Sequence, residues 1–282
     1  MSSPSTPTAT TATQGIRYGA KPVEARRNRE LEATRSEIWS DSLEAVYETD
    51  AELIAAVLPP PLEPGPEPRV RLNITQVTMP GNYVFGAGWF GVQARHGDVL
   101  GEYALFMPMS TEQATVGGRE TFGEPKKIAQ FTSSRTGGEG DTGRGLGAEV
   151  SAAISRMGFT VAEIHGRVTG EREPTEHHRI DFYFKLSPSP EDPGALDADP
   201  LIVHSHKHLT ERTAAGVEGE VVLGDSPVDP VGDLPVRRLI DIALTERTSV
   251  VDAKVIGTVP RDDLLPYIHQ RYDDLSVLGK KD

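Results

Sequence analysis

The sequence contains no cysteine, which excludes disulfide bonds, thiolate metal ligands and thiol nucleophiles. This absence also suits a reducing compartment, so we expect the protein to be cytoplasmic. No stretch approaches the roughly 20 consecutive apolar residues of a membrane span, and the apolar run at 53–58 ends at prolines. We therefore expect a soluble protein without a membrane partner.

Positive charge is also scarce, because 29 basic side chains stand against 42 acidic ones and the net charge is −13. No stripe of lysine and arginine runs along any segment. This balance argues against nucleic acid and against anionic membrane surfaces as partners. It leaves a small anionic substrate open, because one local cationic pocket can override the field of the whole molecule.

The N-terminal residues 1–13 are rich in Ser, Thr, Pro and Ala, and they lack the basic start and apolar core of a signal peptide. We expect a disordered tail over 1–25. Neither an internal repeat nor a break in composition divides the remainder of the sequence. The region 26–282 is therefore expected to form a single domain.

Three long segments rich in β-branched and aromatic residues follow one another at 69–79, 83–94 and 99–109. Turn sequences at 80–82 and 96–98 separate them, which predicts an antiparallel meander. Further strands are expected at 43–47, 148–155, 160–166, 179–186, 201–208, 218–223 and 249–258. Helices are expected at 51–57 and 261–270, and loops at 137–147 and 188–200. Many strands and few helices predict an α+β, predominantly β fold, either a closed barrel or a sandwich.

The segment 117–129, GGRETFGEPKKIA, has the glycines and the proline of a tightly shaped loop, with charged groups between apolar residues. An amine attacks a carbonyl only when it is neutral, whereas a free lysine has a pKa of about 10.4. Burial or a second nearby cation lowers this value. Lys127 offers the cation to Lys126, and Phe122 and Ile128 offer the burial. The alternative interpretation is an ordinary pair of solvated lysines.

Several short motifs accompany this segment. GRE at 118–120 and PKK at 125–127 have the spacing of the active-site segment of acetoacetate decarboxylases. GEYALFM at 101–107 is similar to the strand that leads into it, and MGF at 157–159 and DLPV at 233–236 match other parts of the same family. The chain thus resembles the acetoacetate decarboxylase superfamily from about residue 40 to its C-terminus.

The resemblance implies a closed, cone-like antiparallel β-barrel with a few peripheral helices, usually assembled into a homo-oligomer. Lys126 resembles the Schiff-base lysine of the family, and Lys127 resembles its electrostatic neighbour. A small keto acid is then the expected substrate, and no cofactor is implied. The positive nitrogen of the iminium would draw electrons from the adjacent C–C bond, so that CO2 leaves or an enamine forms and attacks an aldehyde.

The sequence also departs from the family pattern. Acetoacetate decarboxylases carry an arginine before the first strand and two glutamates in the strands that follow, and these places align with Ser40, Asn73 and the stretch 86–88. Glu124 stands where the decarboxylases have an aromatic residue. These departures favour a divergent aldolase or dehydratase that keeps Lys126. The alternatives are a β-keto acid decarboxylase and a non-catalytic barrel that binds keto acids.

Other charged and apolar residues near the motif are candidates for the site. Glu124 is either a general acid/base or an ion-pair partner that positions Lys127 or Arg119. Arg119 and Glu120 form either a structural pair or a substrate contact, in which the arginine binds a carboxylate. The predicted substrate-binding set is Arg119, Glu120, Phe106 and Met157.

His204, His206 and His208 alternate along an expected strand and should therefore share one face. Three imidazoles on one face are a possible metal site. Solvated histidines on a strand explain the pattern equally well, and the matching family requires no metal. The glycines at 143–147 are not a dinucleotide fingerprint, because no βαβ unit surrounds them. We therefore expect chemistry without a metal or a cofactor.

Overall fold

The computed structural model of the protein describes residues 18–20, 38–192 and 194–279. The expected disordered tail over 1–25 lies outside these residues except for 18–20. No helix in the described part of the chain is long and apolar enough to cross a membrane.

The chain is built mainly from strands, as the β-branched and aromatic segments predict. The strands are β1 (Trp39–Glu48), β2 (Glu63–Pro64), β3 (Arg69–Met79), β4 (Tyr83–His96), β5 (Val99–Met109), β6 (Lys126–Ile128), β7 (Gln130–Thr136), β8 (Glu149–Arg156), β9 (Phe159–Arg172), β10 (Glu176–Lys185), β11 (Leu201–Leu223) and β12 (Arg238–Thr258). The α-helices are α2 (Ala51–Val57), α3 (Glu112–Phe122) and α4 (Arg261–Leu264). Short 3₁₀ helices cover Glu139–Asp141, Val231–Asp233, Leu265–Gln270 and Leu275–Gly279.

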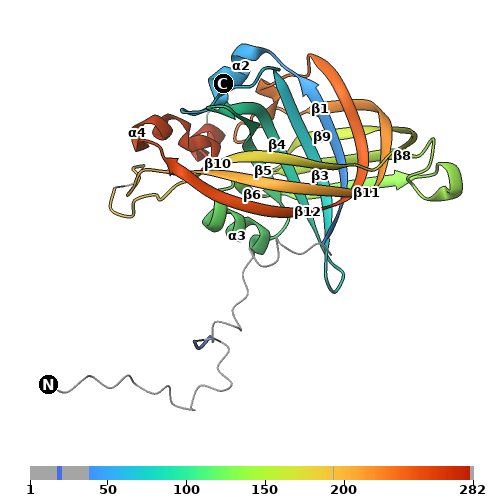
Figure 1. Ribbon diagram of the computed structural model, residues 1–282, viewed down its shortest axis with the longest axis horizontal. Helices are drawn as coiled ribbons and strands as arrows, with labels where there is room; N and C mark the ends of the chain where they lie inside the picture. Colours follow the sequence, from blue (N-terminus) through green and yellow to red (C-terminus); the bar gives the residue numbers. More distant parts are fainter. Residues whose placement is uncertain (1–17, 21–37, 193, 280–282) are drawn as a thin grey trace.

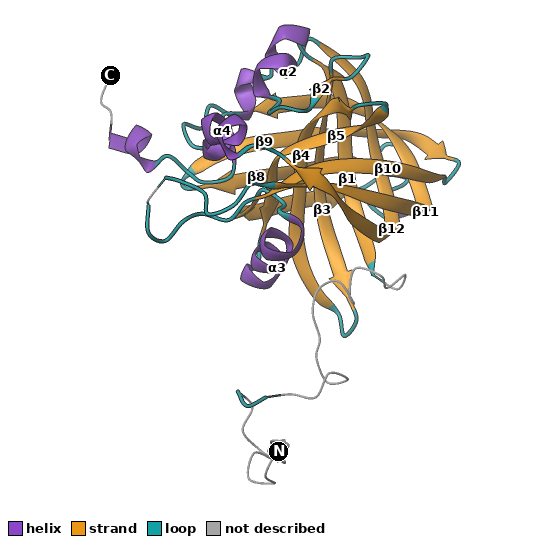
Figure 2. Ribbon diagram, turned by 60° about the vertical axis from the view of Figure 1, so that its left-hand side comes forward, coloured by secondary structure: helices purple, strands orange, loops and turns teal. Residues whose placement is uncertain are grey.

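One large sheet closes on itself in a ring (Figure 1). Its strand order is β10-β5-β4-β3-β1-β12-β11-β9-β8-β7, and β10 also pairs with β11, which closes the ring. The far half of β11 leaves the ring and pairs with β9, so that β9, β8 and β7 form an extension of the sheet. In Figure 2, α2 and α4 lie near each other at the edge of the sheet, whereas α3 lies apart from them.

The meander β3-β4-β5 is confirmed, with a register that runs from the Met79–Tyr83 pair to the His96–Val99 pair. The expected purely antiparallel order is wrong at two places, because β5 pairs in parallel with β10 and with β6. The two strands expected at 201–208 and 218–223 are parts of the single long strand β11. Strand β12 begins at Arg238 rather than at 249, and β7 was not expected.

The two faces of the ring have different roles because strand side chains alternate. Outward-facing residues such as Leu43, Leu72 and Leu244 join residues of β8 and β9 in a large apolar core. A smaller cluster that includes Trp89 and Tyr183 belongs to the opposite face of the strands. The core therefore packs the extension against the ring, while the interior of the ring stays available for a cavity.

Candidate active site

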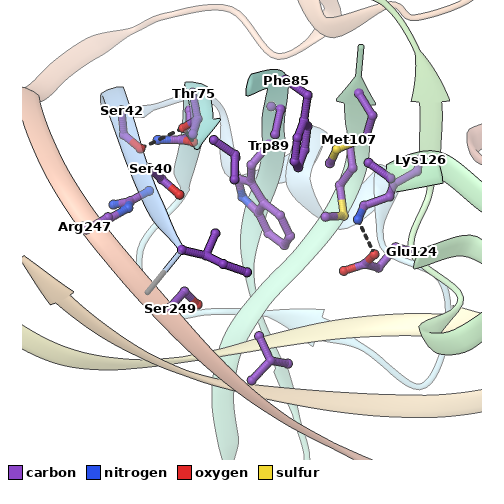
Figure 3. A pocket seen from close by; sticks show the side chains of 18 of the residues that line it. Ser40, Ser42, Thr75, Phe85, Trp89, Met107, Glu124, Lys126, Arg247 and Ser249 are labelled. Carbon is purple, nitrogen blue, oxygen red and sulfur yellow. Dashed lines mark hydrogen bonds and ion pairs between the residues drawn. The ribbon is translucent and has the colours of Figure 1, made fainter. Parts of the chain in front are cut away.

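A cavity of about 260 Å³ occupies the interior of the ring (Figure 3). Its wall consists of residues from eight strands, together with the beginning of α3 and the segment that follows this helix. Apolar wall residues include Phe85, Trp89, Met107, Met109, Leu209 and Val251. Polar wall residues include Ser40, Ser42, Asn73, Thr75, Glu124, Lys126, Arg179, Lys207, Arg247 and Ser249.

The tight turn that ends α3 places Lys126 in the wall of this cavity. The expected loop at 117–129 is wrong in its first half, because α3 continues to Phe122. The helix ends at Gly123 in the left-handed region, with φ of 79°, where its N–H donates to the carbonyl oxygen of Arg119 at 3.1 Å. A Cβ at Gly123 would lie 2.5 Å from the Cα of Lys185. Only glycine allows this turn, after which β6 begins at Lys126 beside Met107 of β5.

Lys126 and Glu124 form an ion pair inside the cavity. Lys126 is only 1% exposed, and its Nζ lies 2.7 Å from Oε2 of Glu124, which is itself buried (Figure 3). Burial favours the neutral amine, whereas the carboxylate favours the ammonium form. Transfer of the proton from nitrogen to oxygen makes both groups neutral without moving net charge into the interior. The arrangement can therefore supply a neutral amine and a nearby acid.

Lys127 does not line the cavity that holds the Lys126 amine, a placement that does not support its expected role as the nearby second cation. Consecutive strand residues face opposite sides, and Lys127 lines a separate cavity of about 300 Å³. Its Nζ lies 2.9 Å from Asp229 Oδ1 and 2.8 Å from Asp273 Oδ1. Arg156 forms ion pairs with the same two carboxylates. Lys127 thus belongs to a buried quartet of alternating charges outside the ring.

Arg119 does not line the cavity, and its guanidinium contacts the backbone of the site instead. Its Nη1 donates to the carbonyl oxygen of Lys126 at 2.9 Å and to that of Arg271 at 3.3 Å. Burial and the neighbouring Arg271 lower the pKa of the Arg119 guanidinium. Arg271 in turn donates to the carbonyl oxygen of Gly123 at 2.6 Å. Arg271 was not predicted from the sequence, because it lies about 150 residues away along the chain and no local motif contains it.

The other three members of the predicted substrate-binding set also lie outside the cavity. Glu120 is exposed on α3. Phe106 is buried and lines the outer cavity, with its ring centroid 5.9 Å from Nζ of Lys127. Met157 is 47% exposed at the turn between β8 and β9. Phe106 faces outward because side chains alternate along β5 and Met107 lines the inner cavity, and Met157 lies at a turn with φ of 52°.

The positions that align with the family's charged residues do line the cavity, and they carry no charge here. Ser40 and Asn73 contribute to the wall. In the stretch 86–88 only Ala87 has a side chain that faces inward, because a Cβ at Gly86 would meet Phe131 and one at Gly88 would meet Pro108. The cavity instead receives its charge from Arg179, Lys207 and Arg247, which sequence reasoning missed.

The alternating histidines of β11 meet other histidines. Nε2 of His204 lies 2.9 Å from Nδ1 of His96, and Nδ1 of His206 lies 3.3 Å from Nε2 of His178. The ring of His208 also packs against His178, with centroids 4.9 Å apart. Burial and the neighbouring imidazoles lower the pKa of His204 to about 4. No group of three or more His, Asp or Glu side chains among the described residues is arranged to hold a metal ion.

Comparison with known proteins places the chain among relatives of the same fold. The sequence model of the acetoacetate decarboxylase (ADC) family matches residues 20–257. An acetoacetate decarboxylase of Clostridium botulinum (strain Eklund 17B / Type B) is 27% identical over 202 residues, which cover 69% of this chain and 77% of that protein.

Two solved structures illustrate the range of the fold. An acetoacetate decarboxylase superposes with a TM-score of 0.64 at 18% identity, covering 84% of this chain and 97% of the other. The enduracididine biosynthesis enzyme MppR, complexed with the condensation product of pyruvate and imidazole 4-carboxaldehyde, superposes with a TM-score of 0.65 at 18% identity. That match covers 78% of this chain and 88% of the other. Because the family match extends over most of the chain, the protein belongs to the acetoacetate decarboxylase family of enzymes.

Proposed function

We propose that the protein is a lyase that forms a Schiff base between Lys126 and a small keto acid, and that it then catalyses an aldol-type condensation or cleavage, or a dehydration. The observation that carries this proposal is the burial of Lys126 in the cavity inside the ring, with Glu124 at 2.7 Å from its amine. A buried lysine is rare unless it has a partner or a chemical role.

The two residues have complementary parts in the reaction. The lone pair of the Lys126 nitrogen attacks the ketone carbon, and the oxygen takes up a proton to give a carbinolamine. Loss of water leaves the iminium, with the protonated Glu124 supplying the proton to the departing hydroxyl. The Glu124 carboxylate then accepts a proton from the carbon beside the iminium. The resulting enamine attacks an aldehyde carbon or expels a hydroxyl from the next carbon as water.

Condensation or dehydration is favoured over decarboxylation because the cavity differs from that implied by the family pattern. Ser40, Asn73 and Ala87 stand at the aligned positions of the arginine and the glutamates. Without those charges the cavity lacks the charged groups that surround the departing carboxylate in the decarboxylases. Formation of the iminium, in contrast, needs only Lys126 and Glu124. The condensation product bound to MppR is consistent with this chemistry on the same fold.

Decarboxylation of acetoacetate or another β-keto acid is the second candidate, supported by the sequence identity to the clostridial decarboxylase. A non-catalytic barrel that binds keto acids is the third. We include in the proposal a cytoplasmic homo-oligomer, which the family resemblance and the lack of cysteine support. Light scattering of the purified protein measures the oligomeric state, and a monomer would contradict this part.

Borohydride reduction in the presence of pyruvate or acetoacetate, followed by peptide mass spectrometry, tests the proposal. One adduct on Lys126 is the expected result, and the Lys126→Met variant is the control that should give none. Release of CO2 from acetoacetate at ordinary enzyme rates, on the order of 10 s⁻¹, would establish the decarboxylase instead. Failure to trap any small keto acid would favour the binding protein.

A further inference from the structure

Arg179, Lys207 and Arg247 of the cavity wall belong to a cluster of charges, which we call the distal cluster. Its cations are Arg71, Arg179, Lys207 and Arg247, and its anions are Glu44, Glu102 and Asp181. Arg247 bonds to Glu44 at 2.9 Å, and Arg71 bonds to Glu102 at 2.8 Å. The network brings together residues of β1, β3, β5, β10, β11 and β12.

The distal cluster has one more cation than it has anions among the described residues. All seven side chains are at most 24% exposed, and Asp181 is completely buried. Burial alone would raise the pKa of the Glu44 carboxyl, but Arg71 and Arg247 hold it well below its ordinary value. The Glu44 carboxyl thus stays ionised. A buried excess of one positive charge is costly unless an anion compensates it.

Trp89 gives a second, independent indication of a ligand at the same place. Its side chain is buried against the cavity, and its indole N–H has no hydrogen-bond partner in the described part of the chain. Buried donors of this kind are rare in folded proteins. The charged ends of Arg179 and Lys207 lie 5.3 Å and 4.9 Å from the centroid of the Trp89 ring. The excess charge and the free donor therefore adjoin one another.

An apolar stretch of wall separates Arg247 of the distal cluster from the reactive amine. Figure 3 shows Trp89 between Arg247 on one side and Lys126 on the other, with Phe85 and Met107 nearby. A cavity of about 260 Å³ also exceeds what a three-carbon keto acid would fill, because it corresponds to the volume of about nine water molecules. A ligand that reaches both ends needs an apolar middle.

We propose that the cavity selects a keto compound whose carboxylate lies at the far end from its reactive carbonyl, with an apolar chain or ring between them. This inference rests on the proposed function only for the position of the carbonyl at Lys126, and the carboxylate site does not depend on it. The carboxylate binds Arg247 and Arg179 and accepts a hydrogen bond from Trp89, while the carbonyl lies at Lys126. One negative charge on the ligand balances the one positive charge of the distal cluster, and the apolar middle packs against Phe85 and Met107.

A binding measurement tests the distal site without any Schiff base. The chain has two tryptophans, and Trp39 does not line the cavity, so Trp39→Phe leaves Trp89 as the only indole reporter. In this background, titration with octanoate should change the fluorescence of Trp89, and titration with 1-octanol should do so far more weakly. Equal affinity for the acid and the alcohol would overturn the proposal.

Matched variants identify the positive charge that binds the octanoate carboxylate. Arg247→Gln should weaken octanoate binding about 10- to 100-fold, as expected for loss of a charge-assisted contact, and Arg247→Lys should restore part of it. Arg167→Gln is the control, because it removes one arginine from an exposed pair with Glu149 on the outer strands. Circular dichroism verifies that each variant is folded. An Arg247→Gln protein that is folded and binds octanoate normally would contradict the assignment.

Trapping with borohydride then separates the two proposals. Keto acids with a terminal carboxylate beyond an apolar chain should be trapped on Lys126 more efficiently than keto compounds of equal length that end in a methyl group. Octanoate binding without any trapped adduct would refute the Schiff-base function and leave the distal site intact. Efficient trapping without preference for the terminal carboxylate would refute the distal site alone.

Discussion

Lys126 and Lys127 are consecutive residues of β6, and their amines lie in separate cavities on opposite sides of this strand. The Lys126 amine is paired with Glu124 in the interior of the ring. The Lys127 amine lies between Asp229 and Asp273, and Arg156 completes a balanced quartet. An amine that must lose its proton is poorly served by two carboxylates. The comparison therefore supports the proposal that the inner lysine carries the chemistry, and it predicts a stabilising role for the outer one.

Replacement of the inner lysine should have the largest effect. Lys126→Met removes the nucleophile, so no borohydride adduct should form with any keto acid and turnover should fall on the order of 10⁴-fold or more. Circular dichroism should remain that of the wild type, because methionine fills a similar apolar volume. Peptide mass spectrometry measures the adduct. An adduct that persists in this variant, and moves to Lys127, would reverse the roles assigned to the two residues.

Replacement of the inner carboxylate should separate adduct formation from the later proton transfers. Glu124→Gln keeps the size of the side chain but removes its acid/base function, so turnover should fall about 10²- to 10⁴-fold. The trapped adduct on Lys126 should remain largely intact. Single-turnover kinetics and mass spectrometry distinguish the two steps. Unchanged turnover would make Glu124 only an ion-pair partner.

Replacement of the outer lysine should act on stability instead. Lys127→Met leaves Asp229 and Asp273 with Arg156 alone, and breaking a buried ion pair on one side costs about 3–5 kcal/mol. Urea denaturation measures this loss, while the folded fraction should still give the Lys126 adduct. The double variant Lys127→Met/Asp229→Asn restores the balance of charge and should recover part of the stability. A stable Lys127→Met protein without an adduct would show that the outer lysine acts in the chemistry.

The outer quartet should also make the protein sensitive to acid, which is the smallest effect expected. Burial alone would raise the pKa of the Asp273 carboxyl, but hydrogen bonds from Arg156 and Lys127 lower it by a larger amount. The net pKa therefore lies below the ordinary 3.8. The stabilisation is therefore complete above about pH 3.8 and is lost as the pH falls through the lower native value. Urea midpoints of wild type and Asp273→Asn should converge over this range. A difference in urea midpoint that does not change with pH would argue against a dependence of stability on the ionisation of Asp273.

Much of the fold follows from local patterns, and the exceptions have physical causes. The meander β3-β4-β5 was predictable because apolar alternation and turn sequences agree. Helix α3 was hidden because Gly117 and Gly118 are poor helix formers, and tertiary contacts override this propensity. Strand β7 was missed because its polar residues pair only with β8 at the edge of the sheet.

The candidate site was predictable only where its signal is local. The spacing around Lys126 lies within one segment, and the same segment contains Glu124. The opposite orientation of Lys127 follows from the strand that begins at Lys126, which the expectation of a loop concealed. Arg179 and Arg247 come from strands that meet only when the ring closes. Their signal is a charged residue at an inward position of its strand, and the inward positions are known only once the ring is known.

The alternation along β4 has a consequence for how this enzyme can diverge. Phe85, Ala87 and Trp89 face the cavity, whereas Gly86 and Gly88 are pressed against Phe131 and Pro108. A single strand thus carries two independent sets of constraints, one at odd and one at even positions. Substitutions at the odd positions can alter which molecules fit the cavity, while the glycines at the even positions keep the ring packed against the extension of the sheet. Evolution can therefore exchange substrates at this scaffold without disturbing the fold, provided that the changes respect that parity.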